Sequence, residues 1–226
     1  MSAEAQATLE NESRIALTAE RRPQVSGFPS LASGTPTSET GMWVVVAAIS
    51  MSFAAFTSSM IVRQGSSVDW LHFQLPRVLY ANTLVLLASS LTLELTRRRM
   101  AAIPAALENS TAEAKALLSN GVYWLYVTAA LGLIFILGQW LAWRNLAAQG
   151  LYLSTNPSSS FFYVFTALHG VHLLGGIGGL IYVLRKFKGI NTNSSVQMNS
   201  LGAFSIYWHF MDILWVYLLL LLVMRM

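Results

Sequence analysis

Five long apolar segments, separated by short polar connections, limit what this chain can fold into more than any other feature. A helix needs about 20 predominantly apolar residues to cross about 30 Å of hydrocarbon at about 1.5 Å per residue. The segments that meet this length cover residues 42–62, 76–96, 121–143, 158–184 and 203–224. The sequence therefore predicts an all-α fold, a polytopic membrane bundle of five transmembrane helices within residues 42–226.

The composition agrees with a membrane location and excludes several other classes of protein. Of the 226 residues, 54% are hydrophobic and 11% charged, whereas about a quarter of an ordinary soluble domain is charged. A chain with this much apolar surface to bury is not disordered over most of its length. The absence of cysteine excludes disulfides, thiolate metal ligands, cysteine nucleophiles and haem attachment through Cys-x-x-Cys-His.

The placement of the basic residues predicts membrane topology rather than nucleic-acid binding. The formal charge is +4, but the 14 Lys and Arg residues lie between the apolar segments instead of gathering on one surface. Five spans put the N-terminal segment and the second and fourth loops on one side, with ten of these residues. The other side carries Arg63, Arg77, Arg144 and Arg225. The positive-inside rule then predicts a cytoplasmic N-terminus and a C-terminus on the other, outer side of the membrane.

Two polar segments outside the spans have their own patterns. Residues 1–41 mix Glu, Arg, Ser, Thr, Gly and Pro without periodicity, which predicts a mobile cytoplasmic tail. They lack the apolar stretch of a signal peptide, so the first span is expected to insert as its own uncleaved signal. Before the third span, Ser110 and Glu113 form a capping-box pattern, which predicts a short helix over residues 111–119.

Ionisable residues inside the spans are the candidate functional residues. An Asp at the centre of a span costs about 2.5–3.5 kcal/mol on insertion scales, so it needs a partner, a proton or a wet cavity. Asp212 is the one deep carboxylate, and His209 lies one turn before it on the same face. His169 and His172, at positions i and i+3 of the fourth span, reach a similar depth. We therefore predict an intramembrane hydrogen-bond network of these four side chains, between the fourth and fifth helices.

Two metal-dependent alternatives use the same side chains. Haem ligation would need His209 opposite His169 or His172 at matched depth. A zinc or copper site would need His169, His172 and Asp212 to converge, although both histidines lie on one face of one helix. The hydrogen-bond network is favoured over both, so no catalytic, cofactor-binding or metal-ligating residue is assigned to this chain. His72, in a loop, is predicted to be a solvated surface residue.

Small and aromatic residues mark the expected packing surfaces. Gly175 and Gly179 form a Gly-x-x-x-Gly pair beside the histidines, and such pairs let helix backbones approach closely. Residues 207–215, which include Trp208 and Trp215, predict a polar and aromatic stripe that faces protein. The aromatic run at residues 161–165 is expected to offer a rigid surface to a partner protein or to acyl chains.

Several short motifs follow one another in a fixed order along the spans. They are Leu75-Pro76, residues 82–90, Gly138-Gln139, residues 159–162, His169-Gly170-Val171-His172 and residues 207–215. Each is weak alone, but their order and spacing together resemble subunit III of the haem-copper terminal oxidases, the cytochrome c oxidase type, in a short five-span bacterial form. The resemblance covers residues 41–224.

The resemblance implies a non-redox accessory subunit of a proton-pumping oxidase that uses cytochrome c and oxygen. Such a subunit packs against oxidase subunit I, holds lipids, supports proton uptake and protects the oxygen-reducing centre. Haem and copper are then expected in partner subunits, and bound phospholipid and a larger respiratory supercomplex fit the same role. The electron donor, cytochrome c or quinol, stays open because its site would lie on subunit II. An independent membrane proton or ion carrier that uses the His and Asp face is the alternative of a different class.

Two departures from the family pattern affect what carries over. The two helices that precede this region in the seven-span form have no counterpart here, so the lipid cleft that they help to form is expected to be absent or reshaped. Ungapped alignment from Gly41-Met42 also places Ile49 where the family has a membrane-embedded Glu. Asp212 is then the only deep carboxylate for the three histidines of the spans.

Overall fold

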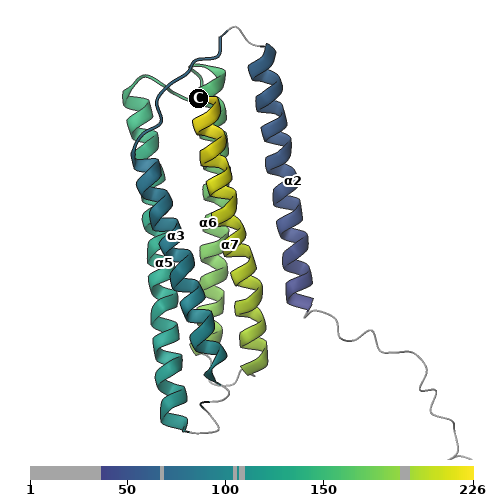
Figure 1. Ribbon diagram of the computed structural model, residues 1–226, viewed down its shortest axis with the longest axis vertical. Helices are drawn as coiled ribbons and strands as arrows, with labels where there is room; N and C mark the ends of the chain where they lie inside the picture. Colours follow the sequence, from purple (N-terminus) through teal and green to yellow (C-terminus); the bar gives the residue numbers. More distant parts are fainter. Residues whose placement is uncertain (1–36, 67–68, 104–105, 107–109, 189–193) are drawn as a thin grey trace, which may run out of the picture. The chain divides into compact units, whose positions relative to one another are not determined.

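Five long helices dominate the part of the chain that the structure describes. The computed structural model describes residues 37–66, 69–103, 106, 110–188 and 194–226. Its helices are α2 (Thr37–Ser66), α3 (Val78–Ala101), α5 (Thr111–Ala148), α6 (Pro157–Lys188) and α7 (Ser194–Arg225), and no strand occurs among the described residues (Figure 1). Each helix contains a stretch long and apolar enough to cross a membrane. The prediction of an all-α bundle with five spans is therefore confirmed.

The helices extend beyond most ends of the predicted spans. Helix α5 is 38 residues long, whereas hydropathy predicted a span of residues 121–143. The short helix expected before this span is instead the first part of α5, with Ser110 at the N-cap but without a side-chain capping hydrogen bond. Helix α2 begins at Thr37, inside the segment predicted as a tail, and residues 1–36 lie outside the described part. Hydropathy detects the length in hydrocarbon, while a helix continues into polar flanks until the local sequence stops it.

A glycine turn ends α5 and directs the chain toward α6. Gly150 has a φ of 77°, in the left-handed region that glycine adopts at little cost. The N–H groups of Gly150 and Leu151 donate to the carbonyl oxygens of Ala147 and Leu146 at 3.0 and 3.2 Å. These bonds satisfy carbonyls that the end of a helix would otherwise leave without partners.

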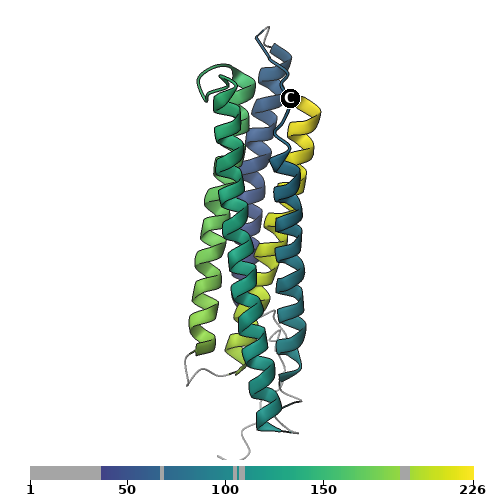
Figure 2. The same ribbon diagram turned by 90° about the vertical axis from the view of Figure 1, so that its left-hand side faces the viewer.

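Helix α7 is the element around which the others are arranged. It packs against α2, α3 and α6, while α3 and α5 lie side by side along their length (Figures 1 and 2). Helix α5 also packs on α6, and α2 touches only α6 and α7 among the described helices. Consecutive helices run antiparallel, so the end of the bundle with the C-terminus also holds the α2–α3 and α5–α6 loops.

The bundle buries its largest aromatic side chains and exposes aliphatic ones. Trp208 and Trp215 of α7 and Phe135 of α5 are fully buried. In contrast, Leu84 of α3 and Leu137 of α5 point outward and are largely exposed. Outward apolar side chains are stable against lipid, where no hydrophobic effect drives helices together. Packing and interhelical hydrogen bonds are therefore what hold these helices to one another.

The α2–α3 loop covers the C-terminal end of α7. Trp70 Nε1 donates to the carbonyl oxygen of Arg225 at 3.0 Å, and the Phe73 N–H donates to that of Met226 at 3.0 Å. Gln64 Nε2 donates to the same Arg225 carbonyl at 3.4 Å. The loop and Gln64 at the end of α2 thus satisfy carbonyls that have no partner within α7.

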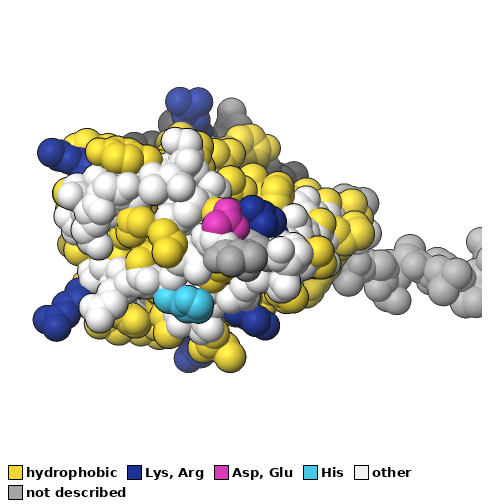
Figure 3. Space-filling model, turned by 90° about the horizontal axis from the view of Figure 1, so that it is seen from above, with side chains coloured by type: hydrophobic (Ala, Val, Ile, Leu, Met, Phe, Trp, Pro, Cys, Tyr) yellow, Lys and Arg dark blue, Asp and Glu magenta, His cyan; other side chains and the backbone are white. Residues whose placement is uncertain are grey.

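Seen from above, this end of the bundle shows basic side chains spread around its rim (Figure 3).

Glycines of α6 form a close contact surface with α7. A Cβ on Gly176 would lie 2.9 Å from Tyr207 Cε1 and 3.3 Å from Trp208 Cζ3. A Cβ on Gly175 or Gly179 would meet α7 side chains only at 3.9 and 3.6 Å, which are ordinary van der Waals distances. The Gly-x-x-x-Gly pair therefore lies on the α6–α7 surface, but the position that requires glycine is Gly176 between them.

Tyr207 also bonds across this surface, which leads to a first prediction. Its hydroxyl donates to the His172 carbonyl oxygen at 2.6 Å, so we expect Tyr207→Phe to lower the free energy of unfolding by about 0.5–1.5 kcal/mol. Thermal unfolding of the full chain in detergent measures the change. Tyr80→Phe, at a half-exposed site on α3, is the matched control. Equal melting temperatures for wild type and Tyr207→Phe would contradict a stabilising role for this bond.

Candidate functional site within the bundle

His169 is the most deeply buried of the polar residues predicted to form a network. On α6 its fully buried ring lies 5.7 Å from the ring of Phe135 and 5.1 Å from that of Trp215, measured between ring centroids. Neither ring nitrogen has a hydrogen-bond partner among the residues that the structure describes. Aromatic rings of α5 and α7 therefore flank this imidazole, and it makes no bond to Asp212.

His172 faces α2 rather than the polar residues of α7. Its Nδ1 lies 2.8 Å from the carbonyl oxygen of Leu168, one turn earlier on α6. Its ring centroid is 5.8 Å from that of Phe53 on α2. The link from His172 to α7 is its backbone carbonyl, which accepts the Tyr207 hydroxyl. The imidazole itself is thus turned away from Asp212.

His209 and Asp212 share a pocket of about 400 Å³ between α7 and α3. Ser90 Oγ of α3 lies 2.5 Å from His209 Nδ1, so the two helices are hydrogen-bonded here. Asp212 is only 4% exposed, and both of its carboxyl oxygens are buried beside the hydroxyl of Ser90. The apolar side chains that complete the lining are Leu87, Ile213 and Val216.

The predicted four-residue network is thus divided among three environments. His169 lies in the aromatic core, His172 lies on the α2 side, and His209 lies with Asp212 on the α3 side. No hydrogen bond joins these environments through the four side chains, within the residues described. Residue counting predicts depth but not the direction in which each side chain leaves its helix. The rotation of α7 about its axis that directs its tryptophans into the bundle also directs His209 and Asp212 toward α3.

Polar contacts between α3 and α5 were not identified from the sequence. Asn82 Nδ2 donates to the carbonyl oxygen of Phe135 at 2.8 Å. Farther along α3, the hydroxyls of Thr92 and Thr128 lie 2.8 Å apart and are buried. Polar side chains that bond across helices are a recognised means of holding membrane bundles together. These two contacts join α3 and α5 at separate depths.

A second set of polar contacts joins α3 to the tryptophans of α7. Trp208 Nε1 donates to Ser89 Oγ at 3.0 Å, and Trp215 Nε1 donates to Thr83 Oγ1 at 2.9 Å. With Ser90, these α3 residues place small hydroxyl groups about two turns apart along the span. That recurrence is the sequence signal from which the contacts could have been predicted.

The candidate metal ligands do not converge in the described part of the chain. No group of three or more His, Cys, Asp or Glu side chains there is arranged to hold a metal ion. His209 is hydrogen-bonded to Ser90, and His169 is flanked by aromatic rings. His72 is exposed in the α2–α3 loop, as predicted for a surface residue.

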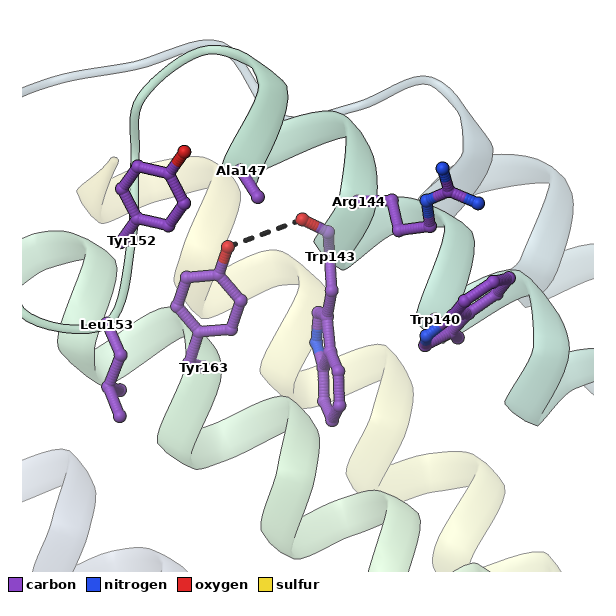
Figure 4. Close-up of a pocket in the computed structure, with 7 residues that line it drawn as sticks. All are labelled: Trp140, Trp143, Arg144, Ala147, Tyr152, Leu153 and Tyr163. Carbon is purple, nitrogen blue, oxygen red and sulfur yellow. Dashed lines mark hydrogen bonds between the residues drawn. The ribbon is translucent and has the colours of Figure 1, made fainter.

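A second pocket, of about 300 Å³, lies beside the C-terminal end of α5, which is the end of the bundle that also carries the C-terminus of the chain (Figure 1). Its lining residues come from α5, the loop after it and α6, and they are Trp140, Trp143, Arg144, Ala147, Tyr152, Leu153 and Tyr163. The Tyr163 hydroxyl donates to the Trp143 carbonyl oxygen at 3.3 Å (Figure 4). The Arg144 guanidinium carbon lies 5.0 Å from the centre of the Trp140 ring. The pocket thus combines apolar and aromatic walls with one cation.

The aromatic run at residues 161–165 offers less surface than the sequence suggested. Phe162 and Phe165 are fully buried and pack inside the bundle. Tyr163 lines the pocket of Figure 4. Alternation around the helix therefore leaves only part of this run able to meet a partner or a lipid.

Comparison with known proteins supplies the family. The family model described as cytochrome c oxidase subunit III matches residues 45–225, from α2 to the last residue of α7. The chain belongs to the cytochrome c oxidase subunit III family. The resemblance inferred from the short motifs is therefore confirmed, and five helices able to span a membrane make this family member a multi-pass membrane protein.

Curated relatives carry related names. The chain is 36% identical over 93 residues to a probable cytochrome c oxidase subunit 3 of Mycobacterium tuberculosis, which covers 41% of this chain and 45% of that protein. It is 35% identical over 98 residues to cytochrome c oxidase subunit 3 of a Synechocystis species, covering 43% and 41%. A cytochrome bo(3) ubiquinol oxidase subunit 3 of Buchnera aphidicola is 32% identical over 92 residues, covering 41% and 44%. The aligned part is thus less than half of each relative.

Proposed function

We propose that this chain is the non-redox accessory subunit III of a proton-pumping haem-copper terminal oxidase in the aerobic respiratory chain. The observation that carries the proposal is the family match, which extends through all five helices. In this role the chain belongs to an enzyme complex that reduces oxygen to water, without contributing a catalytic residue. Haem and copper are assigned to partner subunits, because the buried histidines of this chain serve packing and interhelical bonds.

The bundle is suited to bracing a neighbouring subunit. Polar contacts tie α3 to α5 and α7, so the helices present a fixed outer surface. That surface is apolar, as a membrane neighbour requires. We assign oxidase subunit I as the main partner, with other oxidase subunits and a larger respiratory supercomplex as further partners. Support for proton uptake follows from holding that neighbour in place.

The proposed location is a bacterial inner membrane, with a cytoplasmic N-terminus and a periplasmic C-terminus. Of the basic residues that the structure describes, the end of the bundle that carries the C-terminus holds only Arg63, Arg77, Arg144 and Arg225. The side with fewer basic residues is the one translocated across the membrane. This distribution supports the stated orientation.

Bound phospholipid is proposed for the pocket of Figure 4. Its apolar walls suit part of an acyl chain, and tryptophan and tyrosine are typical of the membrane–water boundary. Arg144 forms no ion pair with a carboxylate among the described residues, so its guanidinium is available to a lipid phosphate. The pocket therefore has the two features that a phospholipid needs, an apolar wall and a cation.

Purification of the full chain with its native partners tests the proposed function. We expect haem absorbance to co-purify with the chain, together with oxygen consumption that continues through repeated turnover. Supplying reduced cytochrome c or quinol in parallel identifies the electron donor, which the names of the relatives leave open. A colourless chain without an oxidase core, and with proton or ion flux in proteoliposomes, would instead establish the independent carrier.

A further inference from the structure

Polar and charged side chains repeat at positions i, i+4 and i+7 on both helices that line the pocket of Asp212, so each row lies on one helix face. The polar ladder, as we call the two rows, consists of Ser205, His209 and Asp212 on α7 and of Ser90, Glu94 and Arg97 on α3. The two helices are antiparallel and pack together (Figure 1). Asp212 and Ser90 therefore lie at the mid-membrane end of the ladder, and Ser205 and Arg97 lie at the end where α7 begins.

At the mid-membrane end of the polar ladder, Ser90 contacts both ionisable side chains of the pocket. Its Oγ lies 2.5 Å from His209 Nδ1. The same hydroxyl is the hydrogen-bond donor to the Asp212 carboxyl group. The three side chains therefore form one hydrogen-bonded row with the serine in the middle.

The other half of the polar ladder is charged and continues to the end of the bundle where α7 begins. Glu94, whose side chain is 30% exposed, interacts electrostatically with His209. It forms ion pairs with Arg97 at 3.6 Å and with Arg98 at 2.9 Å, and Arg97 donates to Ser205 Oγ at 3.5 Å. Helices α2 and α6 also pack against α7, but none of their ionisable side chains in the described part of the chain acts on the histidine or on the buried carboxyl group.

Beyond Asp212 the polar ladder stops. The next turn of each helix presents Val216 and Leu87, which line the same pocket with apolar atoms. Asp212 lies near the middle of the span of α7, and its carboxyl oxygens are buried. Ser90 is the side chain that donates to them. The Ser90 hydroxyl is therefore the route by which a proton reaches Asp212.

The single proton of this hydroxyl determines the direction of the hydrogen bonds. A serine hydroxyl donates one hydrogen bond, and an ionised carboxylate only accepts. When Asp212 is ionised, Ser90 donates to it, so His209 Nδ1 carries a proton and donates to Ser90 Oγ. When Asp212 is protonated, it donates to Ser90 Oγ, Ser90 donates to His209 Nδ1, and the imidazole proton lies on Nε2. The charge of Asp212 thus selects the tautomer of the neutral His209.

We propose that Asp212 is a buried proton store and that His209 and Ser90 form the relay that fills and empties it. A proton binds to His209 Nε2, the Nδ1 proton moves to Ser90 Oγ, and the hydroxyl proton moves to the Asp212 carboxylate. Each proton that arrives on one atom releases the next, so the net change is one proton gained by the carboxyl group. Rows of Asp, Glu and His side chains carry protons in other membrane proteins. The proposal goes beyond bracing and depends on the side chains of this chain alone.

Nitrogen-15 NMR of labelled histidine tests the coupling between His209 and Asp212. The chain has four histidines, and the signals that disappear in His209→Gln belong to His209. In the full chain in lipid nanodiscs, we expect a protonated Nδ1 at alkaline pH and a protonated Nε2 alone once acidification has filled Asp212. In Asp212→Leu, Ser90 is free to donate to Nδ1, so we expect the proton on Nε2 wherever the imidazole is neutral.

The control for this measurement is Gln139→Leu, which removes a buried polar side chain of α5 and should leave the His209 tautomers as they are in the wild type. A wild-type His209 with its proton on Nε2 at alkaline pH would overturn the proposal. An imidazolium that forms on acidification while Asp212 stays ionised would also overturn it. Both outcomes are read from the wild-type chain, so they do not depend on the folding of a variant.

Infrared spectroscopy of the full chain tests the store and the relay. We expect a protonated carboxyl band on acidification, identified by its absence in Asp212→Asn, and we expect the band to shift after transfer to D₂O. Ser90→Ala should slow this shift by about 100-fold, since a positioned proton-transfer group typically contributes at least this much. Ser90→Thr keeps the hydroxyl and should restore the rate.

Ser89→Ala is the matched control, because it removes the neighbouring hydroxyl, which bonds to Trp208 outside the relay. Its band should shift at the wild-type rate. Circular dichroism of each variant confirms that a slower shift is not a loss of helix. A carboxyl band that appears at no pH at which the chain stays helical, or equal rates in Ser90→Ala and Ser89→Ala, would overturn the proposal.

Discussion

Replacing Trp215 by alanine is expected to lower the free energy of unfolding by about 3–5 kcal/mol, the range for removing a buried tryptophan. The side chain is fully buried at the junction of four helices. It starts on α7, lies 4.9 Å from the Phe135 ring of α5 and 5.1 Å from the His169 ring of α6, and donates to Thr83 of α3. Its removal leaves a cavity that none of the four helices can fill alone.

The cost of Trp215→Ala comes mainly from packing. Thr83 keeps a partner after the substitution, because its hydroxyl also donates to the Leu79 carbonyl at 2.8 Å. Trp215→Phe, which retains most of the ring but not the donor, should therefore cost only about 0.5–1.5 kcal/mol of the total. Thermal or denaturant unfolding of the full chain in detergent measures both changes.

A second tryptophan provides the control for this prediction. Trp140 of α5 is 52% exposed, so Trp140→Ala removes the same side chain from the surface and should leave stability nearly unchanged. The prediction fails if Trp215→Ala and Trp140→Ala unfold at the same temperature.

The number and approximate position of the helices could be predicted because hydropathy depends only on local composition. A helix of about 20 apolar residues is stable across the hydrocarbon of the membrane, whatever its neighbours are. The first and last residues of the helices were harder to predict. Residues 37–41 and 111–120 are polar or mixed, and nothing in their hydropathy distinguishes an extended helix from a loop.

The polar groups show a different limit of sequence reasoning. The depths of His172 and Asp212 follow from counting residues, but their partners depend on which helices are neighbours and on how each is rotated about its axis. His172 of α6 meets α2 and His209 of α7 meets α3, because α6 packs against α2 and α7 packs against α3. Short loops predict that α6 and α7 are adjacent, yet they do not predict which faces meet. The same limit explains why Gly176 rather than Gly175 makes the tightest approach to α7.

Gly138→Ala is expected to destabilise the contact between α3 and α5 by about 2–3 kcal/mol, mostly through the cost of leaving buried polar groups unpaired. A Cβ at this position would overlap Asn82 Oδ1 and lie 2.7 Å from Asn82 Cγ. Asn82 cannot move away freely, because its Nδ2 donates to the Phe135 carbonyl oxygen at 2.8 Å inside the bundle. Displacing the amide breaks that bond where water cannot replace it.

Two further variants separate this clash from the general effect of replacing a glycine in a helix. A Cβ on Gly178 of α6 would meet no atom within 4 Å, so Gly178→Ala should be neutral or stabilising by up to about 1 kcal/mol through helix propensity. In the double variant Asn82→Ala with Gly138→Ala, the overlapping amide is gone, and the second substitution should add almost nothing to the first. Thermal unfolding of the full chain in detergent gives the values for the single and double variants. If Gly138→Ala matched Gly178→Ala, or if its cost persisted without the Asn82 amide, close approach of α3 and α5 at this glycine would not be what the fold requires.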